Sequence, residues 1–255
     1  MTNITKKSNT LREAIATATL IVSDPATIVA AIERVLAPDD LGGLHVLITA
    51  GGTREAIDPV RFIGNRSSGK QGHALAEDAV ARGAKVTLVT SAAQPIPAGV
   101  EAIPVVTAAE MEEAVLLHSD SADVIVMAAA VADFRPVAAA PSKIKKQGGV
   151  PAIELEPTPD ILAGLGARKR PDQVLVGFAA ETDDVEAHAA DKLSRKGLDL
   201  IVANDVSAAG VGFEHDTNAV TLLDADGLRR EVTLTSKRAV AAAILDVVAE
   251  RLGRS

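Results

Sequence analysis

The 255-residue chain contains no cysteine, no tryptophan and no tyrosine, and aromatic residues make up only 2% of it. Without cysteine there is no disulfide framework, no thiolate nucleophile and no cysteine-ligated zinc, which fits a reducing compartment. General nucleic-acid binders combine a basic excess with stacking aromatic rings, whereas this chain has a formal net charge of -8. An anionic ligand must therefore be met by local cations.

Long apolar runs are also absent. No stretch approaches the roughly 20 apolar residues of a membrane span. Lys6 and Lys7 precede an apolar stretch at 14–22 that imitates a signal peptide only faintly, because Arg12 and Glu13 crowd it. The five histidines show no metal-ligand spacing, so no protein metal ligand is assigned. We expect a cytoplasmic protein.

Apolar residues are abundant at 47% and fall in short runs that alternate with helical patterns. This alternation predicts a three-layer α/β/α, Rossmann-like (ribokinase-like) domain around a mostly parallel sheet. A C-terminal antiparallel hairpin at 218–235 is predicted around Asp226 and Gly227. The expected strands are 45–50, 85–90, 101–106, 123–129, 174–180 and 198–203, and the expected helices are 69–82, 108–118, 159–169, 185–196 and 237–252.

Two regions are predicted along the chain. Residues 1–43 read as a leader helix and linker, because Asp24 and Pro25 cap an amphipathic pattern that ends in "APDDLGG". Residues 44–255 read as the main domain. Within it, 135–150 is rich in proline, alanine, lysine and glycine and has no periodicity, which is typical of a mobile loop.

The stretch "GNRSSGKQG", residues 64–72, resembles a phosphate-binding loop. Gly64, Gly69 and Lys70 have the required spacing, but Gln71 stands where a magnesium-binding hydroxyl is needed. The segment still opens a helix, whose first N–H groups suit an anion. On spacing alone, phosphate binding and an ordinary serine cap are about equally supported. No G-x-G-x-x-G follows the first strand, which disfavours a dinucleotide-binding dehydrogenase.

The preceding segment, "GGTREAIDPVR", carries several charges. Arg54, Glu55, Asp58 and Arg61 are enough for an internally paired turn, and we expect Glu55 to pair with one of the arginines. Arg61 lies four residues before Asn65, so a helical or turn-like segment would let both face one ligand. An arginine beside a helix N-terminus that can bind phosphate would suit a carboxylate or a phosphate ligand.

Polar residues follow the ends of several predicted strands, where open α/β sheets bind ligands. These stretches are "GGTRE", "AVADFRP", "ETDD" and "NDVS". The lysines of "KIKK", Lys143, Lys145 and Lys146, lie in the predicted loop. Such a run is usually a solvated cluster. Alternatively, it would close over a polyphosphate and neutralise charge in a transition state.

Several motifs occur together in a specific order: "TAGGTREAIDPVRFIGNRSSGKQG", "AAAVADFRP", "KIKK", "GFAAET" and "KGLDLIVANDVS". Together they resemble the phosphopantothenate-cysteine ligase domain of coenzyme A biosynthesis, in its bacterial, CTP-using form. The resemblance runs from about His45 to Leu252. In most bacteria this domain follows a flavin-dependent decarboxylase, and residues 23–38 are similar to the tail and linker of that half.

The resemblance implies a two-step reaction. The carboxylate of 4'-phosphopantothenate attacks the α-phosphate of CTP, giving an acyl-cytidylate and pyrophosphate, and the cysteine amine then displaces CMP. It implies catalytic roles for Asn65 at the acyl carbonyl, Arg61 near the pantothenate and Lys143 at the triphosphate. The implied phosphate or CTP contacts are Ser67, Ser68, Gly69, Lys70, Ala129, Ala130, Asp133, Pro159, Asp160, Ile161, Leu162, Phe178, Lys192 and Lys196.

The implied co-substrate is CTP, with Mg²⁺ on its phosphates. The family also implies a homodimer, for which the 210–223 segment with its hairpin is the expected surface, and a decarboxylase domain or partner. Two other readings remain open: an NAD(P)-dependent oxidoreductase, and a nucleotide-binding subunit without catalysis. No nucleic-acid or membrane partner is expected.

Overall fold

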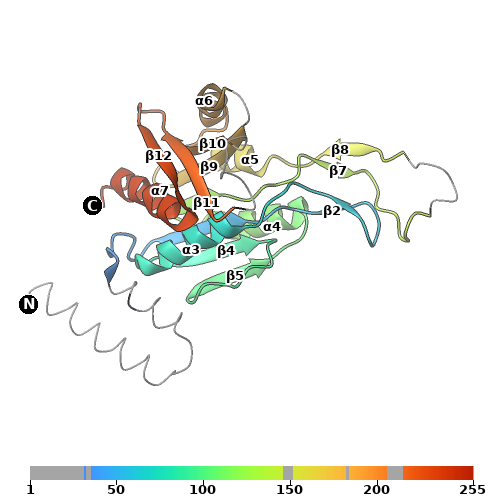
Figure 1. Ribbon diagram of the computed structural model, residues 1–255, viewed down its shortest axis with the longest axis horizontal. Coiled ribbons are helices and arrows are strands. Elements are labelled where there is room, and N and C mark those ends of the chain that lie inside the picture. Colours follow the sequence, from blue (N-terminus) through green and yellow to red (C-terminus); the bar gives the residue numbers. More distant parts are fainter. Residues whose placement is uncertain (1–31, 33–35, 146–151, 182–183, 206–214, 255) are drawn as a thin grey trace, which may run out of the picture.

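The computed structural model describes residues 32, 36–145, 152–181, 184–205 and 215–254. A single eight-stranded sheet has the strand order β12-β11-β10-β9-β6-β1-β4-β5 (Figure 1). All neighbouring strands from β10 to β5 are parallel, and β10, β11 and β12 pair antiparallel. This confirms the predicted fold. The bounds are β1 His45–Ala50, β4 Lys85–Thr90, β5 Val100–Pro104, β6 Val124–Met127, β9 Val174–Glu181, β10 Leu200–Asp205, β11 Thr217–Leu223 and β12 Arg229–Ser236.

Helices cover both faces of the sheet, because the central strands are apolar on both sides. In β1, Val46 and Ile48 belong to one buried cluster and Leu47 to the other. The first cluster packs under α3 and α7, which lie side by side in Figure 1, and the second packs under α4, α5 and α6. The bounds are α3 Lys70–Ala81, α4 Ala108–Ser119, α5 Ile161–Arg168, α6 Val185–Arg195 and α7 Lys237–Arg251.

A second, smaller structure projects from this body, as Figure 1 shows. It consists of β2 (Glu55–Ala56) paired with β3 (Phe62–Ile63), and β7 (Phe134–Pro136) paired with β8 (Leu155–Pro157). We call residues 55–63, 134–145 and 152–157 the arm. Sequence patterns did not predict these strands, and the expected loop at 135–150 begins inside β7. Such short strands carry too few residues for a visible period.

The predicted leader, including the cap at Asp24 and Pro25, lies outside the described residues. The linker that follows is packed onto the body. Leu41 is fully buried, and its N–H donates to the carbonyl of Arg82 at 3.1 Å. The Arg82 guanidinium in turn pairs with Asp40. In the parts of the chain that the structure describes, no helix is long and apolar enough to cross a membrane.

Candidate functional site

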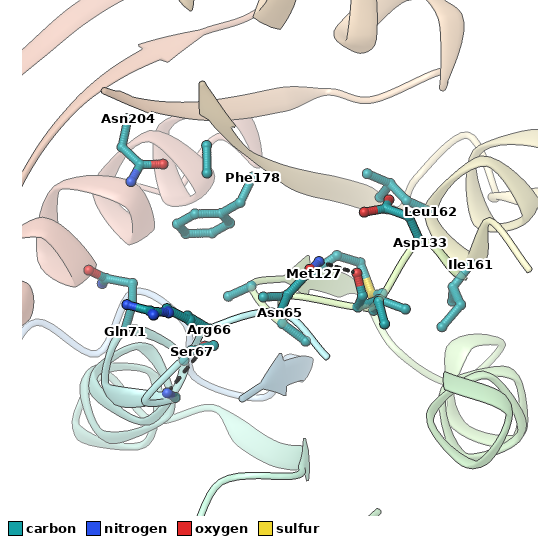
Figure 2. Close-up of a pocket in the computed structure, with 18 of the residues that line it drawn as sticks. Asn65, Arg66, Ser67, Gln71, Met127, Asp133, Ile161, Leu162, Phe178 and Asn204 are labelled. Carbon is teal, nitrogen blue, oxygen red and sulfur yellow. Dashed lines mark hydrogen bonds between the residues drawn. The ribbon is translucent and has the colours of Figure 1, made fainter. Parts of the chain in front are cut away.

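A pocket of about 730 Å³ opens beyond the carboxyl ends of β1, β6, β9 and β10 (Figure 2). Its size lies in the range of small-molecule sites, and its position is where open α/β sheets bind ligands. It brings together every residue that the sequence suggested for the site except Arg61 and Lys143. Those that line it are Asn65, Ser67, Ser68, Gly69, Lys70, Ala129, Ala130, Asp133, Pro159, Asp160, Ile161, Leu162, Phe178, Lys192 and Lys196.

The floor of the pocket is the start of α3. Gly69 has a φ of 74°, and a Cβ there would lie 2.4 Å from the Cβ of Ala92, so both backbone and space require glycine. No side chain caps this helix, and Ser67 Oγ accepts a hydrogen bond from the Gly69 N–H at 3.3 Å. The turn thus leaves the positive end of α3 open to the pocket, which suits an anion.

Asn65 lies between this helix start and the loop after β6. Its Nδ2 donates to the carbonyl of Val131 at 2.8 Å, which uses one of the two amide N–H groups and leaves the other for a ligand. The loop itself is tied to the end of β1, because the Ala130 N–H donates to the Gly51 carbonyl at 2.8 Å. The two strand ends therefore hold Asn65 and the backbone of Ala129 and Ala130 in one place.

The opposite side of the pocket is built by α5, α6 and β9. Asp160 caps α5 by accepting from the Ala163 N–H at 3.0 Å, and Lys196 Nζ contacts its carboxylate at 2.9 Å. Burial opposes the charge, but the hydrogen bond from Lys196 holds the pKa of Asp160 below its ordinary value. Lys192 Nζ donates to the Phe178 carbonyl at 2.7 Å. The two lysines thus fix two pocket walls, including the aromatic ring that stands in the pocket (Figure 2).

Six polar residues that line the same pocket were not predicted as site residues: Arg66, Gln71, Thr158, Asn204, Asn218 and Lys237. Asn204 lies in "NDVS", a stretch already marked by its position after a strand. Asn218 and Lys237 come from β11 and the first residue of α7, outside the parallel strands to which that rule applies. The sequence around these two residues does not place them at the pocket, because their position depends on how the C-terminal hairpin and helix pack.

The two exceptions lie together on the arm. Arg61 Nε donates to Asp58 Oδ2 at 3.0 Å, and its Nη2 donates to the Ile144 carbonyl at 3.1 Å. The Ile144 N–H also donates to Asp58 Oδ2. Lys143, next in sequence, is exposed, and Lys146 lies outside the described residues. Asp58 therefore joins both predicted catalytic segments, but away from the pocket lining.

One expectation about this segment is wrong, and one condition is not met. A helical or turn-like segment would have let Arg61 and Asn65 face one ligand, but β3 makes the intervening residues extended. Glu55 was expected to pair with an arginine, but its Oε1 accepts from the Ala108 N–H at 2.8 Å. Asp58 is the arginine partner instead, and Arg61 holds the pKa of that carboxyl well below its usual range.

The chain is similar to known proteins over most of its length. Residues 41–252 match the model of the DNA/pantothenate metabolism flavoprotein C-terminal domain. The coenzyme A biosynthesis bifunctional protein CoaBC of Bacillus subtilis (strain 168) is 50% identical over 236 residues, which cover 89% of this chain and 57% of that protein. The chain thus spans little more than half the length of this relative.

Solved structures show the same fold. The C-terminal domain of a coenzyme A biosynthesis bifunctional protein CoaBC superposes with a TM-score of 0.73 and 43% identity, covering 85% of this chain and 100% of that one. A Cab2 variant in complex with phosphopantothenate-cysteine has a TM-score of 0.69 and 18% identity, covering 90% and 96% of the two chains. The chain belongs to the DNA/pantothenate metabolism flavoprotein C-terminal domain family.

Proposed function

We propose that this chain joins 4'-phosphopantothenate to L-cysteine at the expense of CTP, in coenzyme A biosynthesis. The observation that carries the proposal is the pocket, in which Asn65 lies between an open helix start and a wall with an aromatic ring. The similarity to CoaBC supports it, as does the likeness to the Cab2 variant, which was solved with phosphopantothenate-cysteine bound.

In the first step, a carboxylate oxygen attacks the α-phosphate of CTP, and pyrophosphate leaves. Both reactants are anions, so the protein must offset their repulsion. The second N–H of the Asn65 amide would donate to the acyl carbonyl, while its bond to Val131 fixes the side chain. The start of α3, from Ser67 to Gly69, would donate backbone N–H groups to the phosphates.

In the second step, the cysteine amine attacks the acyl carbon, an amide bond forms, and CMP leaves as the nitrogen loses a proton. Asn65 would stabilise the negative charge that develops on the same carbonyl oxygen. CMP would be held at the wall of the pocket formed by Phe178, Lys196 and residues 159–162. Backbone N–H and carbonyl groups of this wall would bind the edge of the base, which is how we account for the proposed use of CTP.

Magnesium is the ion that the family implies on the triphosphate. Among the described residues, two carboxylates line the pocket, and Lys196 engages one of them, Asp160. The other is Asp133. One carboxylate together with phosphate oxygens and water suits Mg²⁺, which rarely takes a ligand shell made only of protein atoms. Asp133 would hold the ion, which supplies charge neutralisation at the phosphates when it is bound.

The protein is further proposed to act as a homodimer. The segment 210–223 with its hairpin, part of which lies outside the described residues, was the first candidate surface. The arm is better supported, because large apolar side chains are exposed over much of it, whereas Leu234 is the exposed large apolar side chain on β12. Those on the arm are Val60, Phe62, Phe134, Val137, Ile153 and Leu155. A decarboxylase domain or partner is proposed from the part of CoaBC that this chain does not cover.

The deciding experiment is a pyrophosphate-release assay with CTP or ATP, with and without phosphopantothenate and cysteine. We expect pyrophosphate release only with CTP and phosphopantothenate, and amide product only when cysteine is added. Nucleotide binding without pyrophosphate release would instead indicate a non-catalytic subunit. NAD retained by the purified protein would favour the oxidoreductase reading, which the missing glycine fingerprint disfavours.

A further inference from the structure

Two helices begin at the same end of the pocket, and both begin with lysine. Lys70 is the first residue of α3 and Lys237 is the first residue of α7, and both line the pocket. Neither helix has an acidic residue in its first turn. Cations are disfavoured at helix N-termini, where the backbone already carries partial positive charge. Two ammonium groups and two helix N-termini, all of them positive, therefore lie at one end of the pocket.

The two lysines are held close together by Asp216. Lys70 Nζ contacts Asp216 Oδ1 at 2.6 Å, and the Lys237 N–H donates to the Asp216 carbonyl at 3.0 Å. Lys237 is only 7% exposed. Burial, with the neighbouring Lys70 charge, lowers the pKa of Lys237 from its ordinary value, and Asp216 only partly offsets this. Asp216 itself is exposed, so water screens its charge more than that of Lys237.

The remaining side chains at this end are cationic or neutral. Figure 2 places Arg66 and Gln71 on one side of the Phe178 ring and Asp133 on the other. Gln71 Nε2 donates to the Lys237 carbonyl at 3.0 Å, which ties α3 to α7. The amides of Asn204 and Asn218 are buried nearby in the same lining. The pocket is therefore polarised, with its carboxylates at one end and its buried lysine at the other.

We propose that Lys237, with Lys70, forms a subsite for the terminal phosphates of the nucleotide, and that Lys237 selects a triphosphate over a monophosphate. An anion of several charges at this position would offset both helix ends and both ammonium groups. The bonds that break and form lie at the α-phosphate, so the subsite would hold the leaving pyrophosphate. Naming the anion as CTP rests on the proposed function. The electrostatic argument requires only a polyphosphate.

The test compares Lys237→Met with the wild-type chain by calorimetric titration of CMP, CDP, CTP and pyrophosphate. Methionine keeps an unbranched apolar stem of similar length and removes the charge. We expect affinity for CTP and for pyrophosphate to fall about tenfold, and affinity for CMP to stay unchanged. The matched control is Lys85→Met, which removes an exposed lysine at the amino end of β4, away from the pocket, and should leave every affinity unchanged.

A purely structural role gives a different pattern. If Lys237 only supported the fold, Lys237→Met would lower the melting temperature and weaken CMP and CTP equally, which would overturn the proposal. We expect the ligand-free variant to keep a melting temperature close to that of wild type, because methionine preserves the packing of the buried stem. Pyrophosphate should raise the melting temperature of wild type more than that of the variant.

Phosphopantothenate also carries a phosphate, so it is titrated as a separate arm. Unchanged phosphopantothenate affinity in Lys237→Met, with a lowered ratio of CTP to CMP affinity, supports the subsite as assigned. A lowered phosphopantothenate affinity with an unchanged ratio of CTP to CMP affinity overturns it. The proposed function is tested independently. If wild type makes no amide product, but Lys237→Met binds pyrophosphate more weakly than wild type, the subsite is supported and the ligase function is contradicted. If wild type makes the amide product and Lys237→Met keeps the wild-type ratio of CTP to CMP affinity, only the subsite is contradicted.

Discussion

The pocket and the arm are built in opposite ways. The pocket lies at the end of a sheet whose strands are buried on both faces, and its polar side chains are fixed by hydrogen bonds from distant segments, as Asn65 is by Val131. The arm consists of strands two or three residues long with exposed apolar side chains. A binding site can therefore be complete within the body, whereas the apolar surface of the arm is of the kind that a partner covers.

The predicted chemistry is divided between these two regions. Asn65 and the nucleotide contacts lie in the pocket, but Lys143 and Arg61 lie on the arm, joined through Asp58. If the residues of both regions act in one reaction, binding should depend on the body and one chemical step should depend on the arm. Substitutions in the two regions should then affect different measurements.

The largest effect is expected in the pocket. Asn65→Ala removes the amide N–H that we assign to the acyl carbonyl, and loss of one such donor typically costs about a hundredfold or more in rate. Single-turnover release of pyrophosphate without cysteine should fall by that amount. CTP affinity and melting temperature should change little, because Asn65 is exposed. Undiminished pyrophosphate release would show that Asn65 does not act on the acyl group.

The next effect is expected on the arm. If the arm acts in the reaction, Lys143→Gln should slow conversion of the acyl-cytidylate to amide by about tenfold, because the positive charge that the resemblance assigns to the triphosphate is lost. Nucleotide affinity should stay close to wild type. Lys145→Gln is a close control, since both lysines are exposed and only two residues apart. Rapid-quench measurement of amide product separates the variants. Equal single-turnover rates for Lys143→Gln and wild type would remove the arm from the chemistry.

A third prediction concerns the surface that the arm exposes. Phe134 and Val137 are 53% and 54% exposed, and Leu234 on β12 is 53% exposed. If the proposed homodimer forms through the arm, replacing Phe134 and Val137 together with serine should shift it to monomer at micromolar concentration, because apolar area buried between copies is lost. Leu234→Ser should leave this dimer intact. Light scattering on a sizing column gives the mass, and the opposite result would return the interface to the hairpin.

The same contrast explains what the sequence could predict. Strands β1 and β4 were predicted to the residue, because short apolar runs bounded by turns define buried parallel strands. The arm strands escaped prediction because each is defined by its partner rather than by a period. Phe134 pairs with Pro157, for example, across a segment that reads as loop.

The site shows a similar division. The rule that ligands bind at strand ends led to the stretches that contain Asp133 and Asn204, and the resemblance to a known family supplied the individual positions, including Phe178. Lys237 could not be found in this way. It reaches the pocket only because α7 packs against α3 and the hairpin returns the chain to the sheet. Such a placement depends on long-range packing that no local pattern encodes.

The smallest predicted effects compare two aspartates. Asp58 on the arm accepts hydrogen bonds from Arg61 and from the Val60 and Ile144 N–H groups, and its pKa is held far below the ordinary value. Asp78 in α3 is half-buried beside Arg82, and this burial raises its pKa. A lowered carboxyl pKa stabilises the fold above the unfolded pKa, whereas a raised one costs stability when the group is ionised.

Asp58→Asn and Asp78→Asn should therefore have opposite signs at neutral pH. Asp58→Asn should speed hydrogen exchange at the Val60 and Ile144 amides. This difference should fade progressively as pH falls below the unfolded aspartate pKa of about 3.9, because the opened state then takes up a proton while the folded carboxylate, whose pKa is lower, stays ionised. Asp78→Asn should raise the melting temperature by roughly 2 °C, and the gain should shrink as pH falls through the raised folded pKa. If both substitutions destabilised the protein at neutral pH, the Arg82 charge would stabilise the Asp78 carboxylate by more than burial destabilises it. The two aspartates would then have the same effect on stability, and the contrast between arm and body would not extend to them.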